Sequence, residues 1–484
     1  MIEKIAVKKP TVAVFGVGHG TYWGQFPGLF ETLEGFHKDF IDIVSKNPVE
    51  ILDFGIISTQ QDAARAADEM NAKGVRFIFC NMTTYATSSV FAPILRNVNA
   101  PMVLVALQPR EKMDYPNATT RMQLENDNIC SVPEFCGAAV RMNKTIQDII
   151  VGKLYGDEKA QTEIRDWCLV ACALERLHNA RIGLMGHVLE SMYDMHTDPT
   201  ALYAAFGVHA PLLELDALLE ETRQVTTEEI EEQKKLILSM FDTPEPKVDA
   251  VTRKLTAEDL ERAARSSAAL MKFIKKYDLD GLAYFYEGTP GSEMRDLAGS
   301  LIVGNSLLIA RGIPMCGEYD IKTCIAMMIM EAIGIGGSFA EIHPIDFENN
   351  CVLVGHDGPH HIQLAEGKPV LRSLIKYHGK AGSGASVEFQ LRKGPITILS
   401  INQDGNGKFR FVIGEGVSRE GEIPATGNTN TRVTFGEDTV DFLKRWSMAG
   451  PTHHFAMGCG NYAGALEKLG KILNLDTFVI QTNK

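Results

Sequence analysis

The chain has 484 residues, of which 45% are hydrophobic and 23% charged, and its formal net charge is −13. One hydrophobic core rarely serves a chain of this length, so two or three domains are expected. The acidic balance and the absence of a basic block exclude nucleic acid as a partner, because such binding depends on lysine and arginine neutralising phosphates.

The sequence also lacks the features of a membrane or secreted protein. No apolar stretch approaches the roughly 20 residues that span a bilayer, and the first apolar segment is too short for a signal peptide. The 9 cysteines are scattered without a CxxC pair, which favours buried free thiols over zinc or redox chemistry. We therefore expect a cytoplasmic protein with no membrane contact.

The first part of the chain alternates apolar runs with amphipathic stretches. Runs rich in β-branched and aromatic residues, separated by helix-like stretches of this kind, are typical of a parallel sheet with crossover helices. The apolar runs are 11–18, 49–57 and 75–82, and the helix-like stretches are 36–46 and 61–74. Residues 1–178 are therefore predicted to form a doubly wound α/β domain.

The same pattern restarts after a long helical stretch over residues 160–179. An apolar run at 180–187 is followed by a charged amphipathic helix at 255–281 and another apolar run at 282–288. These elements predict a second doubly wound α/β domain over residues 179–325.

The last part of the chain, residues 326–484, consists mainly of short β-rich pieces separated by Gly, Asn and Asp. The longest of them span 349–357, 386–403 and 407–419. Strands at this spacing indicate an antiparallel barrel or sandwich. The predicted fold class is thus α/β, with two doubly wound parallel-sheet domains followed by a C-terminal antiparallel β-barrel domain.

Potential metal ligands are concentrated in this last part and just before it. Glu318 begins an apolar helix, and Glu341 follows a Gly-rich turn. His356 ends a β-run, and His453 and His454 are adjacent in a later loop. Two carboxylates and imidazoles from separate elements can hold a divalent cation such as Mn²⁺ and leave positions open for two substrate oxygens.

Each of these residues also has a purely structural interpretation. A glutamate at a helix N-terminus often complements the helix dipole, a histidine at a strand end is often hydrogen-bonded within the fold, and a histidine pair in a loop is often solvated. Spacing alone leaves both interpretations open.

Four motifs in this region resemble those of the L-arabinose isomerase family and its L-fucose isomerase relatives, in the family's order. They are Glu-x-Asp-x-Lys-Thr at 318–323, a Gly-Gly-Ser-Phe-x-Glu segment at 336–341 with one residue fewer than the family, Val-Leu-Val-Gly-His at 352–356, and Gly-Pro-Thr-His-His at 450–454. The chain is identified by them as a distant member of this family.

The resemblance implies a metal-dependent aldose–ketose isomerase that moves a carbonyl between C1 and C2 of a free sugar through an enediol. It implies that Glu318 and Glu341 act as acid and base and that both, with His356 and His454, hold a divalent metal, taken to be Mn²⁺. The neighbouring His453 is expected to contact the substrate. Proton transfer on both faces of an enediol requires two such groups.

The departures from the family pattern lie in segments with which the family contacts its sugar substrate. Residues 130–136 lack the family's substrate-touching His and Arg, and the polar segment at 18–24 is also changed. Met192 matches a position where the family places a substrate-facing Met. The resemblance therefore predicts the chemistry, whereas the sugar could be fucose-like, galactose-like or acid-substituted.

The family also implies a homo-oligomer, a trimer or hexamer with its active site at a subunit interface. In this interpretation His19, Tyr22 and Trp23 reach the substrate of a neighbouring copy; in the alternative, the aromatic cluster caps the first strand. Rival functions are an isomerase or epimerase of another sugar and a non-catalytic sugar-binding protein. A dinucleotide site at 16–20 is disfavoured, because Thr21 stands where the third glycine is required.

Overall fold

The computed structural model describes residues 2–245, 251–377, 380–424, 426–436 and 438–480. Its contacts divide the chain into two compact units. The amino-terminal unit is Lys8–Glu175, and the main unit comprises Met1–Val7 together with Arg176–Lys484. The domain boundaries at 178/179 and 325/326 stay predictions.

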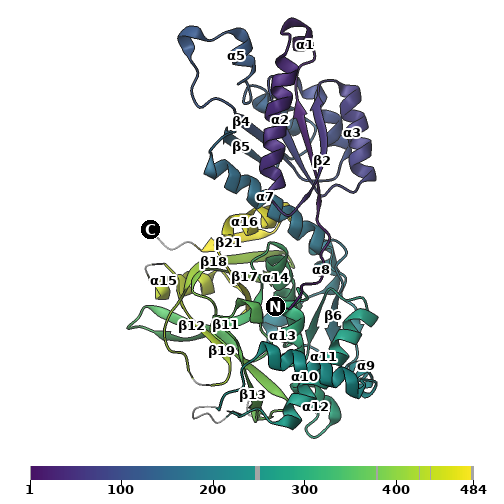
Figure 1. Cartoon of the computed structure of the whole chain (residues 1–484), viewed down its shortest axis with the longest axis vertical. Coiled ribbons are helices and arrows are strands. Elements are labelled where there is room, and N and C mark those ends of the chain that lie inside the picture. The colour runs from purple at the N-terminus through teal and green to yellow at the C-terminus, as the bar shows by residue number, and fades with distance from the viewer. Residues whose placement is uncertain (1, 246–250, 378–379, 425, 437, 481–484) are drawn as a thin grey trace. The chain divides into compact units, whose positions relative to one another are not determined.

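The amino-terminal unit is built on a five-stranded parallel sheet in the order β2-β1-β3-β4-β5 (Figure 1). Its central strands are apolar on both faces, as expected of a parallel sheet covered on both sides by helices. The strands are β1 Thr11–Val17, β2 Glu50–Ile57, β3 Phe77–Met82, β4 Met102–Gln108 and β5 Asp148–Lys153. The helices are α1 Thr21–Gln25, α2 Leu29–Ser45, α3 Gln60–Ala72, α4 Ala92–Asn97, α5 Thr120–Leu124, α6 Val132–Arg141 and α7 Glu158–Leu177, with short 3₁₀ turns η1 Ser88–Val90 and η2 Tyr115–Asn117.

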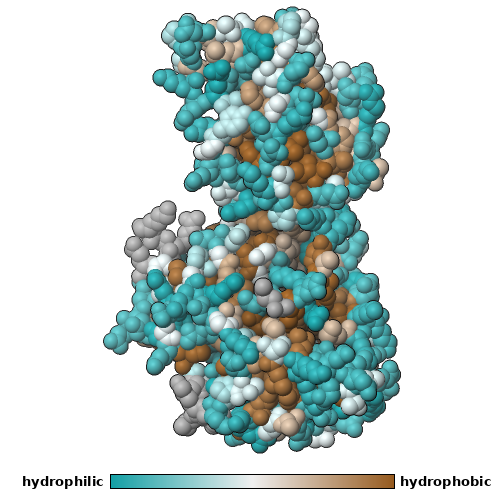
Figure 2. Space-filling model, in the orientation of Figure 1, coloured by the Kyte–Doolittle hydropathy of each residue, from teal (hydrophilic) through white to brown (hydrophobic). Residues whose placement is uncertain are grey.

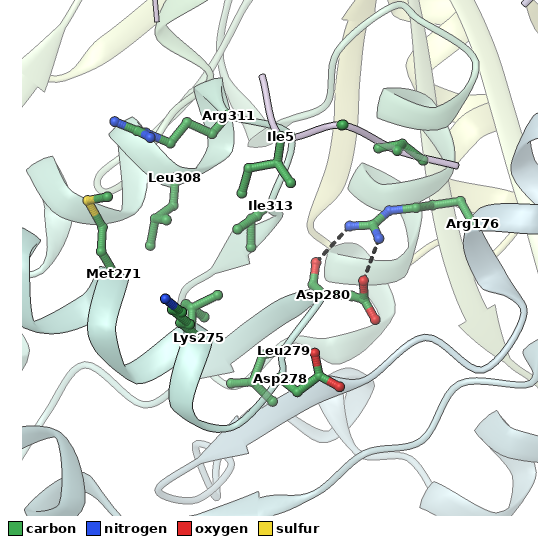
Figure 3. Close-up of a pocket in the computed structure, with 14 residues that line it drawn as sticks. Ile5, Arg176, Met271, Lys275, Asp278, Leu279, Asp280, Leu308, Arg311 and Ile313 are labelled. Carbon is green, nitrogen blue, oxygen red and sulfur yellow. Dashed lines mark hydrogen bonds and ion pairs between the residues drawn. The ribbon is translucent and has the colours of Figure 1, made fainter. Parts of the chain in front are cut away.

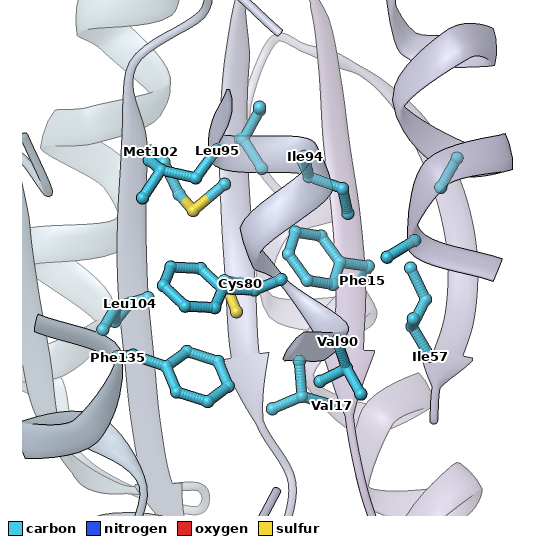
Figure 4. Packing of buried hydrophobic residues seen from close by; sticks show 14 of the residues in the cluster. Phe15, Val17, Ile57, Cys80, Val90, Ile94, Leu95, Met102, Leu104 and Phe135 are labelled. Carbon is cyan, nitrogen blue, oxygen red and sulfur yellow. The ribbon is translucent and has the colours of Figure 1, made fainter. Parts of the chain in front are cut away.

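Alternation of side chains along the strands sorts the core of this unit into two layers. On one face, Phe15 and Leu104 pack with Phe135 of α6 (Figure 4). On the other, Phe79 contacts Phe40 of α2 with ring centroids 6.0 Å apart. Helices therefore cover both faces, and the sheet is doubly wound.

The helix α3 illustrates how local sequence produces this packing. Thr59 caps its N-terminus, where the side chain accepts a hydrogen bond from the backbone N–H of Asp62. Ala63, Ala67 and Met70 recur at helical spacing and are buried against the sheet. Small residues on this face allow the helix to approach the strands closely.

The first part of the main unit holds a four-stranded parallel sheet in the order β10-β9-β6-β7. The strands are short, and long helices surround them. The strands are β6 Ile182–Met185, β7 Leu212–Leu213, β9 Gly281–Tyr284 and β10 Met315–Cys316. The helices are α8 Pro199–Phe206, α9 Leu215–Arg223, α10 Thr227–Met240, α11 Ala257–Lys276, α12 Glu293–Gly299, α13 Ile302–Ala310 and α14 Ile321–Ala332, with η3 Tyr193–Met195.

A six-stranded antiparallel barrel follows. Its strand order is β17-β20-β11-β12-β19-β18, and pairing of β18 with β17 closes it. The barrel strands are β11 Ser338–Asp346, β12 Cys351–His356, β17 Gly394–Gln403, β18 Phe409–Arg419, β19 Thr429–Thr434 and β20 Phe455–Cys459. The parallel sheets and this closed barrel confirm the predicted fold class.

Smaller elements complete the main unit. β21 Asp476–Ile480 adds to β18 in parallel. A three-stranded sheet has the order β16-β13-β8, and β14 pairs with β15. The remaining elements are β8 Thr252–Arg253, η4 Ile362–Leu364, β13 Val370–Leu374, β14 Lys376–Tyr377, β15 Lys380–Ala381, β16 Ala385–Glu388, α15 Thr439–Met448 and α16 Ala463–Ile472.

The helix α14 joins the parallel sheet to the barrel. It is largely apolar, and every residue from Ile321 to Met330 is buried, Lys322 included. It packs on β9 and β10 on one side and on β17 and β20 on the other. Its N-terminus therefore lies where the carboxyl end of β10 meets the barrel.

Hydrophilic side chains cover most of the visible surface, and hydrophobic residues appear in patches on each unit (Figure 2). Within the described residues, every helix is too short or too polar to traverse a lipid bilayer. Six of the cysteines are buried, Cys136 and Cys459 are partly exposed, and Cys130 is exposed.

Candidate metal centre and active site

The four predicted metal ligands converge in the main unit. Glu318 lies in the turn between β10 and α14, at the carboxyl end of the parallel sheet. Glu341 of β11 pairs in register with Gly355, so the following residue, His356, ends β12 beside it. His454 directly precedes β20, which pairs with β11 on the other side. Sheet register and the position of α14 thus bring together residues that are far apart in the chain.

The distances between these side chains are short. The Nε2 atoms of His356 and His454 lie 3.3 Å apart. Glu318 places Oε1 3.7 Å from His356 Nε2 and Oε2 3.7 Å from His454 Nε2. Glu341 has a carboxylate oxygen within 4.8 Å of ring nitrogens of both histidines. Glu318, His356 and His454 are at most 4% exposed, whereas Glu341 is partly exposed.

A hydrogen bond on the far side of each imidazole indicates which ring nitrogen carries the proton in the neutral tautomer. Nδ1 of His356 lies 2.9 Å from the carbonyl oxygen of Asp357, and Nδ1 of His454 lies 3.1 Å from the carboxylate of Asp320. Both partners only accept hydrogen bonds, so we assign the proton of each neutral ring to Nδ1. Two Nε2 lone pairs then face each other across 3.3 Å. A divalent cation fits this arrangement, because metal-bound histidines characteristically donate their other N–H to a carbonyl or carboxylate.

The backbone that presents Glu318 is strained. Glu318 and Tyr319 have φ angles of 59° and 63°, two consecutive side-chain-bearing residues in the left-handed region. The backbone N–H of Tyr319 donates to the carbonyl of Tyr284 in β9 at 2.9 Å, which ties this turn to the sheet. Strain of this kind persists where the surrounding structure imposes it and is common at functional sites.

Asp320 supports the candidate site from the buried interior through its hydrogen bond with His454. It is fully buried, caps α14 by accepting from the backbone N–H of Thr323 at 2.9 Å, and orients His454. Burial alone would raise its pKa, but the hydrogen bond from His454 and the charge of Lys322 outweigh burial and lower it.

Lys322 is also buried, and burial lowers its pKa. Its ammonium group donates to the carbonyls of Asp194 and His196 and to the side-chain oxygen of Asn402. It therefore ties the loop after β6 to the helix that carries Asp320.

A further pair extends the site toward solvent. His453 Nδ1 lies 2.7 Å from an oxygen of Asp194, which also accepts the backbone N–H of His453 at 3.0 Å. The hydrogen bond from His453 is the main reason that the pKa of Asp194 is well below its usual range. Burial would lower the pKa of His453, but Asp194 outweighs it and raises this pKa. His453, Glu318 and His454 offer ligand atoms within 4.8 Å of one another.

The sequence analysis missed Asp194. The residue lies in the 3₁₀ turn η3 in the connection after β6, and only its place beyond the carboxyl end of a parallel strand could have indicated a site residue. Met192, which the resemblance proposed as substrate-facing, is partly exposed in the same loop, two residues earlier.

The predicted residues His19, Tyr22 and Trp23 lie in the amino-terminal unit, just beyond the carboxyl end of β1. His19 contacts the rings of Tyr22 and Tyr85, with centroids 5.0 Å and 6.0 Å away. Tyr85 follows β3, so the three rings surround the point where the strand order reverses, a place where open α/β sheets bind ligands.

Trp23 differs from its two neighbours. Its ring contacts Phe30 at 5.2 Å, and a Cβ on Gly18 would come within 2.7 Å of it. Trp23 therefore packs against residues of its own unit while staying partly exposed. His19 and Tyr22 keep partly exposed polar groups.

Two cavities of the main unit lie at opposite ends of the strands of its parallel sheet. One of about 420 Å³ is lined by Ile5, Arg176 and Asp280, among others, and Arg176 donates to Asp280 (Figure 3). Asp280 precedes β9, so this cavity is at the amino ends of the strands. The other, of about 720 Å³, is lined by His187 and Glu287 after β6 and β9. Ligands of α/β sheets bind at the carboxyl ends of the strands, where the second cavity lies, although its lining includes none of the four predicted metal ligands.

Comparison with known proteins provides an independent line of evidence. No family model matches the chain. Sulfoquinovose isomerases of Priestia aryabhattai and Priestia megaterium are 25% identical over 331 residues, 67% of this chain and 70% of theirs. The L-arabinose isomerase of Oceanobacillus iheyensis is 21% identical over 410 residues, 83% of each chain, and that of Shewanella baltica 22% over 382 residues, 78% of this chain and 74% of its own. Among solved structures, a C2-type ketoreductase from a modular polyketide synthase, 12% identical and covering 65% of this chain and 81% of its own, has a TM-score of only 0.20.

The relatives that match most of the chain are thus sugar isomerases, and the protein is an enzyme of the aldose–ketose isomerase class. The sulfoquinovose and L-arabinose isomerase homologues, 21–25% identical over most of the chain, support its identification as a distant member of the L-arabinose isomerase-like family. The family resemblance drawn from the four motifs is confirmed.

Proposed function

We propose that the protein interconverts an aldose and its ketose with the help of a divalent metal, held by Glu318, Glu341, His356 and His454. The observation that carries this proposal is the pair of Nε2 atoms 3.3 Å apart, each 3.7 Å from an oxygen of the Glu318 carboxylate. Nitrogen and carboxylate donors of this kind suit Mn²⁺, which is the metal we propose.

The reaction moves one proton between C1 and C2 and another between the two attached oxygens. Glu318 reaches the site from the helix side and Glu341 from the barrel side, so the two carboxylates can serve the two transfers across an enediol. When bound, the metal would supply positive charge to two neighbouring sugar oxygens and keep both carboxylates ionised. We also propose that His453 holds a sugar hydroxyl, which its hydrogen bond with Asp194 supports by fixing the orientation of the ring.

The substrate we propose is a free sugar, in keeping with the names of the relatives. A specific observation favours a sugar with an acidic substituent, such as the sulfo group in the name of sulfoquinovose. Arg295 is only 6% exposed, and within the described part of the chain its guanidinium meets a carbonyl, that of Ala381 at 3.3 Å, but no carboxylate. A buried cation without a counter-ion is costly, and a bound anion would stabilise it.

Arg295 shares an electrostatic neighbour with Glu318, the phenol of Tyr286. Burial raises the pKa of Tyr286, the charge of Glu318 raises it further, and the charge of Arg295 opposes both. Glu318 and Arg295 therefore act on the same phenol. We propose Arg295 as the group that recognises the acidic substituent.

For the assembly we propose a homotrimer or homohexamer in the cytoplasm, in which His19, Tyr22 and Trp23 of one copy complete the site of another. Sedimentation of the wild-type protein tests the assembly. His19→Ala should raise the KM for sugar without changing metal affinity, and an unchanged KM would remove His19 from the site.

The central test combines metal titration with turnover on a panel of neutral and sulfonated aldoses. Glu318→Gln and Glu341→Gln should each lose turnover and weaken Mn²⁺ binding, while Glu348→Gln, an exposed control on the same barrel, should behave as wild type. Wild-type turnover by either site variant would disprove its role as acid or base. Arg295→Gln should raise the KM of a sulfonated sugar about tenfold or more with the KM of neutral sugars unchanged, whereas Arg265→Gln on α11 should change neither.

A further inference from the structure

A third cavity of the main unit contains none of the proposed metal ligands. Its volume is about 590 Å³, within the range of small-molecule sites. It is bounded by the turn before β11, the end of β20 and the segment 361–369, which follows β12 in the chain. Residues from six separate parts of the chain line it, including Lys4, Met240, Gly336, Lys368, Arg392 and Cys459.

The charge of this cavity is opposite to that of the chain as a whole. Lys4, Lys368, Arg392 and His361 line it, and the lining includes no aspartate or glutamate. The whole chain carries a net charge of −13. A concentration of cations in one concave surface raises the local concentration of anions.

The carboxylates nearby balance these cations only in part. Glu331 pairs with both Lys4 and His361. Lys368 pairs at 2.9 Å with Asp242, whose side chain is 60% exposed. Within the described residues, Arg392 forms no ion pair through its side chain. Its guanidinium, which can grip an anion with two parallel hydrogen bonds, is therefore available to a ligand.

His361 supplies an independent observation. It is only 2% exposed, and Nε2 lies 3.1 Å from the carboxylate of Glu331. Its Nδ1 is buried and has no hydrogen-bond partner among the described residues. Buried polar atoms without a partner are rare in folded proteins, and an atom of a ligand is one way in which they are satisfied.

We propose that this cavity binds a small metabolite through a phosphate-type dianion, held by Arg392 and Lys368, with Lys4 adding positive charge and His361 offering its buried Nδ1 as a further contact. The proposal goes beyond sugar isomerisation and does not depend on it. Phosphate suits the cavity because it presents several oxygens to donors that arrive from different directions.

The test is calorimetric titration of the metal-free full chain with inorganic phosphate and with glycerol 3-phosphate, at constant ionic strength set with chloride. Saturable binding of one equivalent is expected. In K368Q/R392Q the affinity should fall by about tenfold or more, whereas K444Q/R419Q, which removes the same two charges from exposed positions of the main unit, should bind as wild type.

Two results would overturn the proposal. One is the absence of saturable heat up to about 10 mM of either compound. The other is equal loss of affinity in both double variants, which would indicate attraction by overall charge. Circular dichroism checks that K368Q/R392Q is folded, and the single variant K368Q, altered at a side chain that is 43% exposed, provides a second measure with a smaller expected loss. Glu318→Gln should bind phosphate as wild type, and a loss there would move the anion to the metal centre.

Discussion

Asp320 connects helix capping to the orientation of a proposed metal ligand, and two substitutions separate these roles. One oxygen of Asp320 accepts the backbone N–H of Thr323, and the other faces Nδ1 of His454 at 3.1 Å. In Asp320→Asn the carbonyl oxygen can keep the cap, which places the amide NH₂ opposite His454. In Asp320→Ala both interactions are lost.

The expected magnitudes follow from these contacts. Loss of an N-cap costs about 1 kcal/mol, and a buried N–H left without an acceptor costs about 1–3 kcal/mol, so Asp320→Ala should lose about 2–4 kcal/mol of stability. Replacement of a group that hydrogen-bonds a metal ligand weakens metal binding about 10–100-fold. Because the NH₂ group of Asn favours the proton on Nε2 of His454, Asp320→Asn should show this loss with stability closer to wild type.

Urea unfolding and Mn²⁺ titration of the two variants measure both quantities. Wild-type Mn²⁺ affinity in Asp320→Asn would refute the assigned role of Asp320 in orienting His454. Equal stability of the two variants would refute the cap. Thr59→Ala, which removes the N-cap of α3, serves as a control that should lose about 1 kcal/mol without any change in metal affinity.

Further predictions concern the barrel, the buried lysine and pH. Gly355→Ala places a Cβ 2.0 Å from the carbonyl oxygen of Thr429, so β12 must move away from β19. Thermal unfolding should show a loss of stability of about 1–3 kcal/mol or more, and titration should show a lower Mn²⁺ affinity. Unchanged stability and affinity would show that the strand adapts to the added methyl group. Lys322→Met should free the loop that carries Asp194, so the KM for sugar should rise more than metal affinity falls; a fall in metal affinity alone would contradict this role. Burial raises the pKa of Glu331, but hydrogen bonds from His361 and Lys4 outweigh burial and lower it below its ordinary 4.5. A lowered pKa in the folded state means that ionised Glu331 stabilises the fold above pH 4.5 and that this stabilisation is lost as the pH falls through the folded-state pKa. The free energies of unfolding in urea of wild type and Glu331→Gln should therefore differ more at pH 7 than at pH 3. A constant difference would contradict the pairing.

The architecture could be read largely from local patterns. Apolar runs alternating with amphipathic helices predicted the doubly wound sheets, because a strand covered on both faces is buried along its whole length and therefore largely apolar, as β3 is. The closure of the barrel could not be read in this way. It depends on the pairing of β18 with β17 and on the register of six strands, which local sequence does not encode.

The candidate site also combines features that local sequence predicts with features that depend on tertiary packing. The sequence alone determined which residues are proposed as metal ligands and their local settings: Glu318 shortly before α14, His356 at the end of β12 and His454 before β20. Only the tertiary structure decided that their atoms face one another, that Asp194 pairs with His453, and that Lys4, Lys368 and Arg392 share one cavity. The physical reason is that helix starts and strand ends follow from interactions between near neighbours in the chain, whereas the meeting of distant side chains follows from packing, for which the chain must first give up the entropy of closing long loops.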